Sequence, residues 1–145
     1  MKEAKDLVKL FRISVLLVGG LSASLSTACY NAQDRTAAET VADRIHGQMS
    51  NRDFAGVYKQ AASGFRTVTE AEFVSQMTEI QNKLGQVQSV KEVAYETGVD
   101  TTAGRTYTLK FAISYDRGLV RETLVLLRGD NNEMQLWRLG IEPIN

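Results

Sequence analysis

The sequence predicts an α+β domain in which three helices pack on a four-stranded antiparallel sheet, preceded by an export signal. Two changes of pattern along the 145 residues support this prediction. An uncharged, apolar run covers residues 13–28, and apolar residues then recur at helical spacing as far as Gly85. After Gly85 the apolar period shortens from 3.6 toward 2, which is typical of strands. The length suits one domain and is too short for two full cores.

Residues 1–28 have the layout of a secretory signal peptide. A net positive segment opens the chain, the uncharged run follows, and the small residues Ser26 and Ala28 lie just before Cys29. A membrane-spanning helix needs about 20 apolar residues. This run is shorter and contains glycine, serine and threonine, so an uncleaved anchor is the weaker alternative. We therefore predict cleavage before Cys29.

The segment Leu25-Ser26-Thr27-Ala28-Cys29 resembles the bacterial lipobox, whose cysteine is acylated and becomes the mature N-terminus. Leu25 stands one position further from the cysteine than the usual lipobox leucine. Cys29 is the only cysteine, so it cannot form an intrachain disulfide, and lipidation explains both its presence and its position. The alternative is an ordinary signal peptide whose product begins with a free cysteine. The resemblance implies a bacterial membrane lipoprotein facing the periplasm, and Tyr30 implies the outer membrane if the cell has two membranes.

Three amphipathic helices are predicted between the signal peptide and Gly85. The first covers about residues 36–50, the second about residues 53–62, and the third begins at Thr69 and ends before Gly85. The first and third open with a capping box, a threonine followed three residues later by glutamate.

Four strands are predicted after Gly85, joined in sequence by turns rich in glycine, aspartate and asparagine. They cover about residues 87–97, 106–115, 119–128 and 133–142. Strands that follow one another through short turns form an antiparallel meander, and helices then cover one face of it. Val93 and Tyr95 are expected on one face of the first strand, and Trp137 is expected on the same face as Leu139 in the last. The third strand has apolar residues in both phases, which predicts that both of its faces are covered.

The order of the elements resembles the nuclear-transport-factor-two-like, or cystatin-like, cone superfamily, and more closely the bacterial lipoproteins within it. The resemblance rests on that order and on three segments, 51–58, 63–66 and 83–87. It implies a curved sheet that closes around an apolar interior as a cone. It raises confidence in a fold far more than in a function.

We therefore divide the chain into a signal peptide (1–28), a lipid anchor with a short linker (29–34) and a single cone-type α+β domain (35–145). Basic and acidic residues balance at 17 each, and the signal peptide holds four of the former and two of the latter, so the mature chain has a net charge of −2. Lysine and arginine are scattered along it. Nucleic-acid binding is not expected from such a chain.

His46 is the only histidine, and it projects from the first helix near Asp43 and Glu39. It is either a general base oriented by a carboxylate or a boundary histidine in a weak surface pair, and the second interpretation is favoured. Tyr58 and Arg138 complete the weak candidates for catalysis.

Charged residues also occur inside the third and fourth strands. Because side chains alternate along a strand, either Arg121 or Glu122 must lie on the helix-covered face. An arginine there would bind an anionic ligand or a partner's carboxylate. A Glu–Arg pair across two strands on the open face is the alternative, and it is favoured.

Neither a metal site nor a cofactor is predicted. One histidine and one acylated cysteine cannot supply the ligands of a zinc site. The chain also contains no glycine-rich phosphate loop and no serine in a nucleophile elbow.

These expectations favour a lipid-anchored cell-envelope protein whose domain binds an envelope protein or a small apolar ligand without catalysis. Two alternatives stay open. One is a small cone-type enzyme, an isomerase, dehydratase or hydrolase, acting on an apolar molecule. The other is a self-associating structural protein, a homodimer formed through the open face of the sheet.

Overall fold

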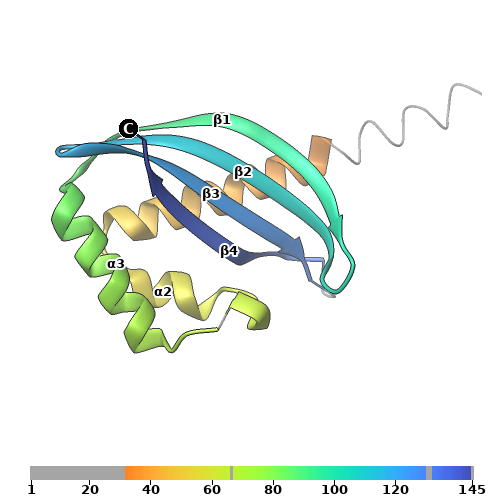
Figure 1. The fold of residues 1–145 in the computed structure, drawn as a ribbon. Helices are drawn as coiled ribbons and strands as arrows, with labels where there is room; N and C mark the ends of the chain where they lie inside the picture. Colours follow the sequence, from red (N-terminus) through yellow and green to blue (C-terminus); the bar gives the residue numbers. More distant parts are fainter. Residues whose placement is uncertain (1–31, 66, 130–131, 145) are drawn as a thin grey trace, which may run out of the picture. The chain divides into compact units, whose positions relative to one another are not determined.

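A computed structural model describes residues 32–65, 67–129 and 132–144 of the chain (Figure 1). The predicted signal peptide, its cleavage site and Cys29 lie outside these residues. The described residues from Ala37 onward form one compact unit of the chain. Across the described segments, no helix has both the length and the apolar character that a membrane crossing requires.

The N-terminal helix covers residues 32–50, so residues 32–34, predicted as linker, are helical. The predicted capping box at Thr36 is wrong, because the helix already includes the turn before it. The Thr36 hydroxyl donates to the carbonyl oxygen of Ala32 at 3.1 Å, as a threonine inside a helix commonly does. The predicted apolar stripe is confirmed, and its buried members are Ala38, Val41, Ala42, Ile45 and Met49.

The second helix, α2, covers Phe54–Lys59 and is shorter than the predicted 53–62. The chain leaves the helical path because the amide of Ala62 donates to the carbonyl oxygen of Leu136, in the last strand, at 2.8 Å. A short 3-10 helix, η1, follows at Ser63–Phe65.

The third helix, α3, covers Glu70–Leu84, and its predicted capping box is confirmed. The Thr69 hydroxyl accepts from the amide of Glu72 at 3.3 Å, and the Glu72 carboxylate accepts from the amide of Thr69 at 2.8 Å. The backbone amide and the hydroxyl of Thr69 both donate to the Glu72 carboxylate, which stabilises its ionised form and lowers the pKa of Glu72. Gly85 ends the helix at φ +88°, in the left-handed region that favours glycine.

The predicted four-stranded meander is confirmed. The strands follow the order β1-β2-β3-β4, and each pairs antiparallel with the next. They cover Val87–Asp100 (β1), Gly104–Tyr115 (β2), Gly118–Arg128 (β3) and Met134–Pro143 (β4). Figure 1 shows the helices on one face of this sheet.

One face of the sheet forms the core with the helices. Alternate residues of β2 and β3 are buried there: Tyr107, Leu109, Phe111 and Ile113, and Val120, Glu122, Leu124 and Leu126. All but Glu122 are apolar or aromatic, so these two strands bury one carboxylate among hydrophobic side chains on this face.

Bulges interrupt both edge strands, and the bulge in β1 corrects a predicted face. In β1 the register shifts between Glu92 and Ala94, so Val93 is an extra residue, 53% exposed, and does not share a buried face with Tyr95. In β4 the register shifts so that Leu136 lies opposite Leu126 and is 1% exposed, while Trp137 is the extra residue and is partly exposed. A bulge interrupts the alternation of faces on which the prediction depended.

The strand β3 lies between β2 and β4, as expected for an inner strand, but the described helices cover only one of its faces. On the other face Leu119 is 43% exposed, and Val125 and Leu127 are partly exposed. The prediction that both faces are covered is therefore not met by the described residues.

Candidate functional site

A buried pair of ionisable side chains connects the N-terminal helix to β3. His46 Nε2 and Glu122 Oε1 lie 2.6 Å apart, and the two side chains are 12% and 0% exposed. The second carboxylate oxygen, Oε2, is buried and has no hydrogen-bond partner among the described residues. Because a buried polar group is costly without a hydrogen bond, His46 is the described residue that satisfies Glu122.

Aromatic side chains lie close to this pair. The His46 ring packs edge-on against Phe111 with 4.6 Å between ring centroids, and Phe111 lies opposite Glu122 across β2 and β3. Burial, together with the charge of Glu122, raises the pKa of Tyr115. The pair thus influences the electrostatics of the interior.

His46 contacts a residue 76 positions along the chain, whereas the sequence had placed it beside Asp43 and Glu39 of its own helix. Asp43 is exposed on that helix. Of the two charged neighbours in β3, Glu122 occupies the helix-covered face, and Arg121 is exposed on the opposite one.

Tyr58 and Arg138 are each engaged elsewhere. The Tyr58 hydroxyl donates to the carbonyl oxygen of Val68 at 2.7 Å, which ties α2 to the segment before α3. Arg138 is exposed, and its guanidinium carbon lies 4.1 Å from the centroid of the Trp137 ring. Both arrangements are common stabilising contacts in proteins.

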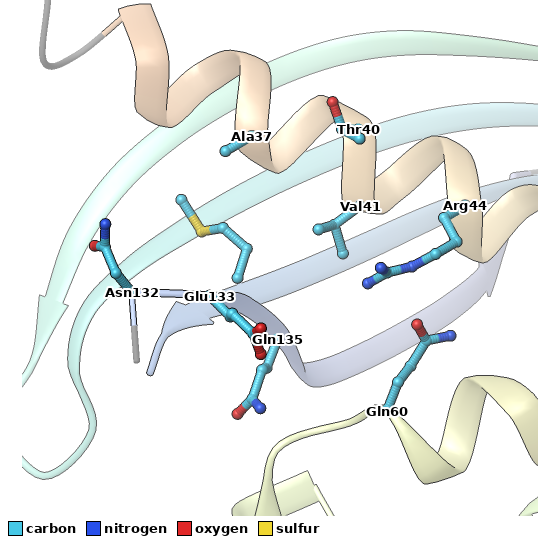
Figure 2. A pocket seen from close by; sticks show the side chains of 9 residues that line it. Ala37, Thr40, Val41, Arg44, Gln60, Asn132, Glu133 and Gln135 are labelled. Carbon is cyan, nitrogen blue, oxygen red and sulfur yellow. The ribbon is translucent and has the colours of Figure 1, made fainter. Parts of the chain in front are cut away.

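A surface groove of about 460 Å³ lies between the N-terminal helix, the end of α2 and the start of β4 (Figure 2). Its volume is within the range of small-molecule sites, roughly 300–1,000 Å³. We call it the Arg44 groove, and it is lined by Ala37, Thr40, Val41, Arg44, Gln60, Asn132, Glu133, Met134 and Gln135.

Arg44 extends from the N-terminal helix into this groove (Figure 2). It follows Val41 and Ala37 by one and two helical turns, which places the three residues on one face of the helix. Among the described residues its guanidinium has neither a hydrogen bond nor an ion pair. Its N–H groups are thus available to a ligand in a planar, fork-like arrangement.

The opposite wall of the groove is held by a chain of side-chain hydrogen bonds. The amide nitrogen of Gln60 donates to Gln48 Oε1, and Gln48 Nε2 donates to Asp53 Oδ2 at 3.1 Å. Asp53 Oδ1 in turn accepts from the amide of Gly56 at 3.0 Å and caps α2. Gln60 is therefore oriented by the protein before any ligand arrives.

A second groove, of about 270 Å³, has a different character. Its described lining contains no charged side chain and consists of Phe65, Thr67, Val68, Phe73, Gln76, Met77, Ile80, Leu139 and Ile141. It offers apolar contact along α3 and β4, and Thr67 and Gln76 are the polar side chains of its described lining.

Three residues of the groove, Arg44, Gln60 and Gln135, are not among the candidates predicted from the sequence. A signal for Arg44 was present, because its spacing from Val41 places it at the edge of the apolar stripe. The other two lie on separate elements, and only the fold brings them to the same groove.

The described part of the chain has no group of three histidine, cysteine, aspartate or glutamate residues that could hold a metal ion. Comparisons with family models, with curated proteins and with solved structures give no match to this chain. The function of the chain is therefore inferred from the chemistry of the site.

Proposed function

We propose that this chain is exported, is anchored to a bacterial envelope membrane through a lipid on Cys29, and binds a small ligand in the Arg44 groove without converting it. The binding proposal rests on one observation: a groove large enough for a small molecule is lined by an arginine, Arg44, that has no partner among the described residues. Ala37, Val41 and Met134 supply apolar contact in the same space, as a typical ligand site requires.

The chemistry of the groove favours binding over catalysis. Arg44 and Glu133 are the ionisable groups of its described lining. Arginine stays protonated and cannot act as a base, and Glu133 already has an interaction partner. The described lining therefore contains no acid and base pair of the kind that proton-transfer catalysis uses.

The enzyme alternative would use His46 as its base, and three observations weigh against it. The Nε2 atom of His46 is engaged by Glu122 at 2.6 Å, and His46 does not line the Arg44 groove. A cavity bordered by Tyr115 inside the core measures only about 10 Å³. Such a cavity accommodates about one water molecule and no substrate.

Export and lipidation are proposed from the sequence of residues 1–29. The positive segment, the apolar run and the cysteine occur in the order that signal processing requires. Each buried methylene of an acyl chain contributes about 0.8 kcal/mol to membrane binding, so several chains on Cys29 would hold the protein firmly.

Native mass spectrometry of the full-length protein, purified in mild detergent from its own membranes, tests the binding proposal. We expect a non-covalent small-molecule adduct that disappears on denaturation. Thr40→Trp fills the groove from an exposed helix position and should abolish the adduct. Ser50→Trp, exposed on the same helix but outside the groove, should retain it. Absence of an adduct from the unaltered protein, or its survival in Thr40→Trp, would contradict the proposal.

A further inference from the structure

We infer that the ligand of the Arg44 groove carries a single carboxylate and that Arg44 binds it. This inference rests on the proposed function and names the chemical class of the ligand. The Arg44 guanidinium extends into a groove of about 460 Å³ and has no partner among the described residues. A guanidinium matches a carboxylate with two parallel hydrogen bonds, which gives both affinity and orientation.

The charge of the groove distinguishes a carboxylate from a more highly charged anion. Arg44 is the cation of the described lining, and Glu133 supplies a negative charge to the same space. A phosphate with two charges would meet one arginine and one carboxylate, with nothing to compensate its second charge. A monocarboxylate needs only the one guanidinium.

The remaining lining indicates what the rest of the ligand resembles. Gln60 and Gln135 present amides, which both donate and accept hydrogen bonds, and Gln60 is fixed by the chain through Gln48 to Asp53. Apolar contact comes from Ala37, Val41 and Met134. These groups together suit a small acylamino acid, which has a carboxylate, a neighbouring amide and an apolar side chain.

The backbone of α2 is adapted to this arrangement at Gly56. A Cβ atom added there would lie 2.1 Å from Asp53 Oδ2 and 2.6 Å from Gln48 Nε2. Any larger residue would therefore displace the two side chains that orient Gln60. Gly56, Asp53 and Gln48 act as positioning residues for the wall of the groove.

The test compares two probes of nearly equal shape, N-acetylleucine and its uncharged primary amide, N-acetylleucinamide. Both are titrated into the ¹⁵N-labelled full-length protein, and backbone and arginine side-chain NMR signals are followed. We expect the carboxylate to bind at least about tenfold more tightly than the amide, with shifts centred on Thr40, Arg44 and Gln135.

Two variants assign the preference to Arg44. Arg44→Gln should bring the two probes to equal affinity, while Arg121→Gln, which removes an exposed arginine on the open face of the sheet, should leave the tenfold difference intact. Arg44→Lys keeps the charge but lacks the planar guanidinium, so its preference for the carboxylate should lie between those of the unaltered protein and Arg44→Gln.

Three results would overturn the inference: equal binding of both probes by the unaltered protein, a preference that survives Arg44→Gln, or no binding of either probe up to about 50 mM, far above any useful affinity. The comparison within the unaltered protein stands even if Arg44→Gln fails to fold. A native adduct without carboxylate preference would leave the proposed binding function in place and reject only the ligand class.

Discussion

Removing His46 alone should destabilise the protein far more than removing His46 and Glu122 together. The Glu122 side chain is 0% exposed, and His46 is the one described residue that bonds to either of its carboxylate oxygens. His46→Leu removes that partner and leaves the carboxylate buried. Breaking a buried pair in this way costs about 3–5 kcal/mol. We expect the lower end, about 3 kcal/mol, because the 12% exposure of the His46 site gives water some access to the vacated space.

The double variant His46→Leu/Glu122→Leu replaces the pair with apolar side chains among Phe111 and its neighbours. Such replacements are often neutral or stabilising. Its free energy of unfolding should therefore lie within about 1 kcal/mol of the unaltered protein, which gives a coupling energy of about 2 kcal/mol or more between the two sites.

Urea unfolding, followed by circular dichroism and by the fluorescence of the single tryptophan, measures these differences. Asp43→Leu on the exposed face of the same helix is the control and should change stability by no more than about 0.5 kcal/mol. A loss below about 1 kcal/mol in His46→Leu, with effects that simply add in the double variant, would refute the reasoning.

Three further predictions concern the cap of α3, the interior and the wall of the groove. Thr69→Ala should lower the free energy of unfolding by about 1 kcal/mol in urea titrations. Because the pKa of Glu72 is lowered on folding, the stabilisation that comes from its ionised carboxylate should be complete above pH 4.5 and should be lost as the pH falls and the carboxylate is protonated. Because the pKa of Tyr115 is raised, its proton is held more tightly in the folded state, so its contribution to stability is complete below about pH 10 and lost as the pH rises further. Ultraviolet titration should show a late-titrating component that Tyr115→Phe diminishes, and an unchanged titration would contradict this. Gly56→Ala should weaken N-acetylleucine binding severalfold by displacing the Asp53 side chain, and unaltered affinity in the same NMR titration would show that the Gln60 wall does not matter.

Short sequence patterns predicted most of the helices and strands. They failed where the structure of the adjoining residues determined the outcome. The same capping signature occurs twice, and it starts a helix at Thr69 but not at Thr36. Before Thr69 the chain is irregular, whereas residues 32–35 before Thr36 are themselves helical, so the helix has no reason to begin there. A capping residue thus marks a helix start only where the preceding chain leaves the helix.

Alternation identified all four strands but could not locate their bulges. Val93 and Trp137 each follow the two-residue pattern in the sequence, and each is the extra residue of a bulge in the structure. Hydrogen bonding to the adjacent strand sets such shifts, and no single-strand pattern records them.

The candidate sites show the same division between local and distant information. Strand phase correctly limited the buried charge to Arg121 or Glu122, because that is a property of one strand. The partner of Glu122 lies 76 residues earlier, and the walls of the Arg44 groove come from three separate segments. These contacts arise only when the helices pack on the sheet.

The intact mass of the mature protein extracted from membranes, compared between the unaltered chain and Cys29→Ser, tests the proposed identity of this protein most directly. We predict a mass equal to residues 29–145 plus a diacylglycerol and one N-linked acyl chain, and loss of that modification in Cys29→Ser. An unmodified chain beginning at Cys29, or an uncleaved chain of 145 residues, would contradict the proposal of a lipid-anchored envelope protein.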